Sequence, residues 1–195
     1  ISGNFTIQLG NVAGTPGSAA QFDFQSLNVG PANRVTIRAG APGQVVVVNS
    51  AGAAASAIGG MLVAEGANGA PPPILFVRNA KGLTIAAGGS ISALSGAVLD
   101  TLAGSWTAGE SIVNQGSVDG GPSLDMLASR INGGGQFKGN AITIRTFGSA
   151  NNPVNGAYFL QNGLQLFPSS GNAIARTPRM TGAFQGAMLS TTPAG

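Results

Sequence analysis

The stretch Ile74–Gly89, ILFVRNAKGLTIAAGG, decides the expected fold. It has two short apolar runs, Ile74–Val77 and Leu83–Ile85, on either side of the polar segment Arg78–Gly82. Short β-prone runs bounded by Asn and Gly are typical of strands joined by tight turns, because glycine readily adopts a left-handed backbone. Units of the same kind recur along the chain, and we expect them to form successive faces of a parallel β-helix.

Most of these units are too short for the strands of a β-sandwich, and Asn-Gly hairpins between long alternating runs do not occur in the sequence. Coils of a β-helix need only short strands, because each coil is stabilised by stacking on the next. With roughly 20–25 residues in a coil, the chain would form about eight or nine coils. The apolar run Val45–Val48 is expected to be covered on both faces. The other expected strands are Phe5–Leu9, Phe22–Phe24, Val35–Ile37, Met61–Val63, Ser90–Leu94, Ala97–Leu99, Ser111–Val113, Gly116–Val118, Leu124–Leu127, Gln136–Phe137, Ala141–Arg145, Tyr158–Leu160 and Leu164–Phe167.

Composition excludes several classes of protein. Of 195 residues, 43% are apolar and 8% are charged, which does not fit disorder driven by low hydrophobicity and high charge. Histidine and cysteine are absent, so disulfides, thiolate chemistry and His-based catalytic triads or metal sites are excluded. The nine Lys and Arg residues are scattered, whereas nucleic-acid binding needs clustered cations. We therefore expect no nucleic-acid partner, no metal and no cofactor.

The chain is expected to form one domain with additions at both ends. We place an N-terminal strand or cap at 1–21, the β-helix at 22–167, and a C-terminal cap or arm at 168–195. The N-terminus, Ile1–Asn4, has neither an initiator Met nor a basic segment. A mature, secreted chain whose signal peptide has been removed would explain this, with an extracellular or cell-surface location.

An ordered set of motifs runs from Phe24 to Thr101. The first motif consists of Phe24 and Leu27–Gly30. The motifs after it are short strands that end in Asn or in a turn of small residues. The later elements are Val35–Ile37, Val45–Asn49, Ser56–Leu62, Ile74–Val77, Asn79–Gly82, Leu83–Ile85 and Ala97–Thr101. Together they resemble the two-partner secretion domain of filamentous haemagglutinin-like exoproteins, over a core of residues 22–101. Ala80 and Lys81 stand where that family prefers Pro and Asn.

The resemblance implies a right-handed β-helix that a dedicated outer-membrane transporter recognises during secretion. Five corner residues would belong to the secretion signal: Asn28, Gly30, Asn49, Asn79 and Gly82. A purely structural interpretation is also open, since Asn amides at strand ends can cap turns or stack into ladders between coils. The same choice applies to Asn114, Asn132, Asn140 and Asn162.

Two other groups of residues have alternative roles. Asp119 and Asp125 could face each other across a corner, as the two acids of a glycosidase must, or they could be solvated turn acids. The aromatic residues of the C-terminal half could stack in the core or include a subunit contact. They are Phe137, Phe147, Tyr158, Phe159 and Phe167.

The expected function is a secreted, non-enzymatic structural protein that stacks head to tail into an extracellular filament for adhesion or a biofilm matrix. The unpaired N–H and C=O groups of a coil end can be satisfied by another coil end. Candidate subunit contacts are Phe5, Ile7, Leu9, Phe159 and Phe167. Alternatively, the chain is a monomeric adhesin or haemagglutinin fragment that binds host glycans or receptors. A carbohydrate-active β-helix enzyme is a third possibility.

Overall fold

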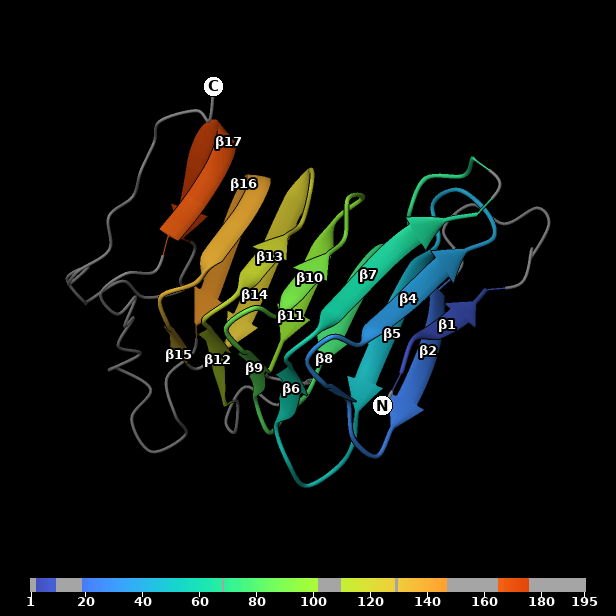
Figure 1. The fold of residues 1–195 in the computed structure, drawn as a ribbon. Coiled ribbons are helices and arrows are strands. Elements are labelled where there is room, and N and C mark those ends of the chain that lie inside the picture. The colour runs from blue at the N-terminus through green and yellow to red at the C-terminus, as the bar shows by residue number, and fades with distance from the viewer. Residues whose placement is uncertain are drawn as a thin grey trace.

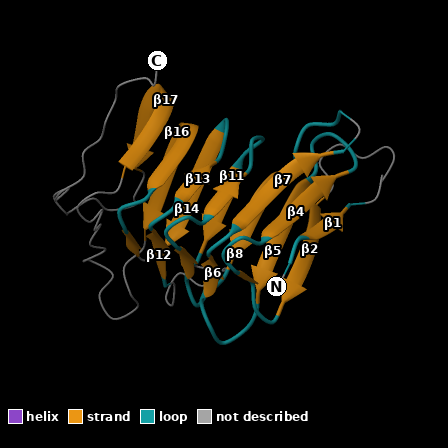
Figure 2. Cartoon of the chain, viewed as in Figure 1, coloured by secondary structure: helices purple, strands orange, loops and turns teal. Residues whose placement is uncertain are grey.

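The computed structural model describes residues 3–9, 19–67, 69–101, 110–128, 130–146 and 165–175. In this part of the chain all regular secondary structure is β-strand, and every strand pairing is parallel. The strands stack side by side from the first coil, blue in Figure 1, to β17 at the other end. Figure 2 shows that loops connect the strands. The chain is therefore a parallel β-helix, and the expected all-β fold class is confirmed.

Each complete coil contributes one strand to each of three faces. The described strands include those of five such coils, and four turns lead from β3 to β15. Face I contains β1 (Phe5–Gln8), β4 (Arg34–Ala39), β7 (Met61–Gly66), β10 (Ser90–Ser92) and β13 (Ser117–Asp119). Face II contains β2 (Ala19–Phe24), β5 (Val45–Ser50), β8 (Ile74–Arg78), β11 (Ala97–Asp100) and β14 (Ser123–Ala128). Face III contains β3 (Asn28–Val29), β6 (Ser56–Ile58), β9 (Leu83–Ile85), β12 (Ser111–Asn114) and β15 (Arg130–Asn132).

The long strand β16 (Gln136–Thr146) continues through the corner between faces I and II. Its first part pairs with β13, and its second part, from Ala141, pairs with β14. The last strand, β17 (Gln165–Ala175), pairs with both parts of β16, with a register shift between Gly139 and Ala141. Parallel pairing therefore continues to Ala175.

The core consists of inward-facing side chains that stack in columns along the β-helix. Strand residues alternate between the core and the outside, so paired residues of successive coils occupy the same column. On face I, for example, one fully buried column contains Val35, Leu62, Ile91, Val118 and Phe137. The columns form a single continuous apolar core.

The stretch Ile74–Gly89 forms two successive faces, as expected. β8 ends at Arg78 on face II, and β9 begins at Leu83 on face III. Gly82 has φ 106°, and its N–H donates to the carbonyl oxygen of Asn79 at 3.0 Å, which closes the turn between the two strands. Glycine is required here because this φ is strained for residues with a Cβ.

Two expectations about the β-helix were wrong, one on the length of its coils and one on the burial of Val45–Val48. On faces I and II of the first five coils, paired residues lie 22 to 30 residues apart, so most of the described coils are longer than expected. Corner segments such as 69–73 add this length between the strands. The run Val45–Val48 is covered on one face only: Val46 and Val48 are buried, but Val45 and Val47 point outward and are half-buried.

Candidate functional site

The buried side chain of Asn79 fixes the corner between faces II and III. Its Oδ1 accepts a hydrogen bond from the N–H of Lys81 at 2.8 Å, which caps the turn. Its Nδ2 donates to the carbonyl oxygen of Ala54 at 3.0 Å and to Oγ of Ser56 at 2.9 Å, both on the preceding coil. One amide therefore holds its own turn and ties it to the coil before.

The other residues suggested as a secretion signal lie in several places. Asn49 pairs with Arg78 on face II, but its side chain points outward, and Nδ2 donates to Asp23 Oδ1 at 2.7 Å. Asn28 lies on face III, where Oδ1 accepts from the N–H of Ala57 at 2.9 Å. Gly30 lies at the corner between faces III and I. The structure brings Asn79 and Gly82 together in one turn and places Asn49 on the neighbouring strand, with its side chain directed outward. Asn28 and Gly30 lie elsewhere, on face III and at the corner that follows it.

A column of glycines lines the corner between faces III and I. Each glycine directly precedes a paired residue of face I: the members are Gly60, Gly89, Gly116 and Gly135. A Cβ on Gly116 would lie 2.1 Å from the carbonyl oxygen of Gly89, and one on Gly135 would lie 2.6 Å from that of Gly116. The backbones of successive coils therefore approach too closely here for any side chain. Sequence reasoning missed this column, although a glycine before each of these strands is its signal.

Asn114 performs a related role beside this column. The fully buried side chain accepts the N–H of Gly116 at 3.0 Å through Oδ1 and donates from Nδ2 to the carbonyl oxygen of Gln136 at 2.9 Å. It thus caps its own turn and holds the next coil, as Asn79 holds the preceding one.

The outer side of face I carries a cluster of three charged side chains. Glu65 accepts hydrogen bonds from Nη2 of Arg34 and, at 2.9 Å, from Nη2 of Arg38. Arg34 also donates from Nε to Oγ1 of Thr36 at 3.2 Å. The bonds from Arg38 and Arg34 lower the pKa of Glu65 below its usual range. The three groups satisfy one another, which favours a stabilising role.

The two acids considered for glycoside cleavage lie on different faces. Asp119 is on β13 of face I, where its Oδ1 accepts the N–H of Gly121 at 2.9 Å and caps the following turn. Asp125 points outward from β14 of face II and is half-buried. Because the two strands belong to different faces, the structure does not bring these carboxylates together.

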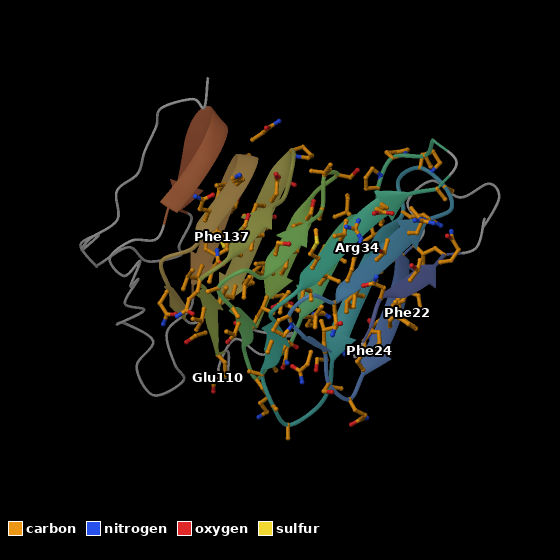
Figure 3. All side chains as sticks on the ribbon, viewed as in Figure 1. Phe22, Phe24, Arg34, Glu110 and Phe137 are labelled. Carbon is orange, nitrogen blue, oxygen red and sulfur yellow. The ribbon has the colours of Figure 1, made fainter. Side chains whose placement is uncertain are left out.

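The first coil exposes apolar side chains at the end of the core. β1, β2 and β3 are the outermost strands of their faces in the described chain. Phe5 is 47% exposed, and Ile7, Phe22 and Phe24 are partly buried against the core. Figure 3 shows Phe22 and Phe24 on the outermost strand of face II. These side chains belong to the same columns as the buried residues of the next coil, but here each column ends.

The structure describes some of the candidate subunit contacts. Phe5 and Ile7 lie on β1, and Leu9, which directly follows it, is buried. For Phe167 the structure describes only its backbone position on β17, paired with Lys138. Phe159 lies outside the described residues, as do Phe147, Tyr158 and Asn162.

Comparisons of this chain with known protein families, with curated proteins and with solved structures found no match. Among the described residues, no helix is long and apolar enough to cross a membrane. That same part of the chain has no group of three or more acidic side chains that could hold a metal ion.

Proposed function

We propose that this protein is a secreted, non-enzymatic structural protein whose β-helices stack head to tail into an extracellular filament. The observation that supports this most directly is the end of the core at the first coil. There Phe5, Ile7, Phe22 and Phe24 occupy inward columns but lack a covering coil among the described residues. A second copy would cover them and continue each column.

The backbone of the first coil favours the same mode of association. The N–H of Leu9 donates to the carbonyl oxygen of Arg38, and that of Ala51 donates to the carbonyl oxygen of Phe24. In a parallel ladder alternate residues bond to opposite neighbours. The N–H groups of Thr6 and Gln21 therefore point away from the second coil, toward the open edge. Neither β1 nor β2 contains the Pro or Lys that commonly protects an edge strand.

Among the described strands, β17 lies at the opposite end of the β-helix. β17 runs parallel to β16 and carries Leu166 at the register position of Phe137 and Ala173 at that of Ile142. A second copy placed on β17 would align these apolar positions with Phe5 and Ala20 of its own first coil. Parallel strands, equal coil shape and apolar columns would then continue from one copy to the next.

The resemblance to two-partner secretion domains supplies the route out of the cell in this proposal. A dedicated outer-membrane transporter would recognise the corner that contains Asn79 and Gly82, and the filament would serve adhesion or a biofilm matrix. The second candidate is a monomeric adhesin that binds host glycans or receptors.

The open-edge N–H groups provide a specific test. The double variant Thr6→Pro/Gln21→Pro removes two edge-facing donors and leaves the bonds between the first and second coils in place. Thr6→Ala/Gln21→Ala is the matched control. Sedimentation velocity at increasing protein concentration should show growing polymers for the wild type and the alanine control, and none for the proline variant. Equal polymerisation of all three proteins, or none by the wild type, would reject end-to-end stacking.

A further inference from the structure

Asn4, Phe5 and Thr6 form an Asn-x-Thr tripeptide at the start of the first coil. No other Asn of the sequence has Ser or Thr two positions after it. This pattern, with any residue except Pro in the middle, is the acceptor for N-linked glycosylation, in which a sugar is joined to the side-chain amide of the Asn. Because so short a pattern also arises by chance, the surroundings of the amide decide whether it can react.

The Asn4 side chain is exposed, and its two polar atoms have different surroundings. Oδ1 accepts a hydrogen bond from the backbone N–H of Arg34 on the second coil at 3.1 Å. Nδ2 has no hydrogen-bond partner among the described residues. An N-linked sugar replaces one hydrogen of the amide nitrogen and leaves Oδ1 as an acceptor. The bond to Arg34 is therefore compatible with modification of the same side chain.

The asparagines at other corners use their amide nitrogens within the fold. Nδ2 donates a hydrogen bond in each of Asn49, Asn79 and Asn114. Asn79 and Asn114 are also buried. Asn4 thus combines the acceptor pattern with an exposed amide nitrogen that the described fold does not use.

Thr6, the third residue of the pattern, is accessible as well. It is exposed, it pairs with Thr36 on the outer side of face I, and its hydroxyl has no hydrogen-bond partner among the described residues. Phe5, between Asn4 and Thr6, occupies an inward column at the open end of the core. β1 is the outermost described strand of face I (Figure 1), so no described coil lies beyond the tripeptide on that side.

We propose that Asn4 is an N-glycosylation site, whose substrate is a sugar activated by a phosphate group at its anomeric carbon. Nδ2 forms a bond to that carbon, and the bond between the carbon and the phosphate oxygen breaks. The carrier phosphate leaves with the electron pair, and the proton displaced from Nδ2 passes to a base of the transferase. The inference does not depend on end-to-end stacking.

Protein purified from the cells that produce it naturally provides the test. Trypsin releases a peptide that ends at Arg34, and mass spectrometry with a fragmentation that preserves side-chain sugars should locate the sugar on Asn4. Asn4→Asp retains the Oδ1 acceptor for Arg34 but lacks the amide nitrogen, and Thr6→Val lacks the hydroxyl. Produced in the same cells, both variants should lose the modification. Thr6→Ser keeps the pattern, so it is the matched control and should remain modified.

The readout is the modified fraction of this peptide, so a lower yield of one variant does not alter the comparison. An unmodified Asn4 in the natural protein, a sugar that persists in the Asn4→Asp variant, or equal modification of Thr6→Val and Thr6→Ser would overturn the proposal. Discrete rods that carry the sugar would reject only the filament, whereas filaments without it would reject only glycosylation.

Discussion

Asn79 donates a hydrogen bond from Nδ2 to the carbonyl oxygen of Ala54, 25 residues earlier in the chain, at 3.0 Å. With the bonds to Ser56 and Lys81, it joins two successive coils at the corner between faces II and III. Such bonds specify how one coil sits on the next, a relationship that backbone pairing alone leaves free to shift along the strand.

Replacing Asn79 therefore has a predictable cost. Asn79→Ala should lower the free energy of unfolding by about 2–3 kcal/mol, because it leaves buried donors and acceptors without partners. Asn49→Ala is the matched control, and we expect a change within about 0.5 kcal/mol, because Asn49 points outward. Denaturant unfolding followed by circular dichroism measures both values. Equal losses for the two variants would contradict the role assigned to Asn79.

The same pair of variants bears on secretion. If a transporter reads the corner itself, Asn79→Ala should block export even when the purified protein is refolded and stable at the growth temperature. If Asn79 acts only through stability, export should recover at lower temperature. Co-expression with the cognate transporter and assay of the culture supernatant distinguish these results.

The glycine column makes a second stability prediction. Gly116→Ala should destabilise the protein by about 2–3 kcal/mol, because the new Cβ would meet the carbonyl oxygen of Gly89 at 2.1 Å. Gly134→Ala serves as control, since a Cβ added there would meet no atom within 4 Å and the φ of Gly134 is not left-handed. Thermal unfolding should leave the control within a few degrees of the wild type. A large shift for Gly134→Ala, or none for Gly116→Ala, would disprove the close stacking of these corners.

Glu65 should make the stability of the folded protein depend on pH in a predictable direction. Its pKa is lowered by hydrogen bonds from Arg38 and Arg34, so the folded state binds this proton less readily than the unfolded state, whose pKa is about 4.3. The stability from Glu65 is therefore present above that value and is lost as the pH falls through it toward the folded pKa. Glu65→Gln should be less stable than the wild type at pH 7, and the difference should shrink below about pH 4. A constant difference from pH 7 to pH 3 would exclude this ion-pair contribution.

The sequence predicts the strands of this fold better than their arrangement. Short runs such as Leu83–Ile85 are recognisable because a small closed coil leaves room for only a few residues on each face. The length of a coil is harder to predict, because corner segments such as 69–73 extend a coil without changing its strands.

Contacts between residues of successive coils cannot be predicted without the register in which the coils pair. Arg34 and Glu65 are 31 residues apart, and nothing local in the sequence relates them. Asn49 follows Val48 directly, whereas Arg78 separates Asn79 from Val77. Asn49 therefore points outward, like its register partner Arg78, and Asn79, one residue further along, is buried. The run Val45–Val48 likewise gives no sign in the sequence that every second valine lies outside the core.

Fibre diffraction from aligned, concentrated protein tests the central claim of end-to-end stacking most directly. If copies stack head to tail, the strand spacing of about 4.8 Å should give a reflection along the filament axis, since coils rise in that direction. Electron microscopy of the same sample should show unbranched filaments that the Thr6→Pro/Gln21→Pro variant does not form. Discrete short rods at every concentration, or a strand-spacing reflection perpendicular to the filament axis, would contradict the account.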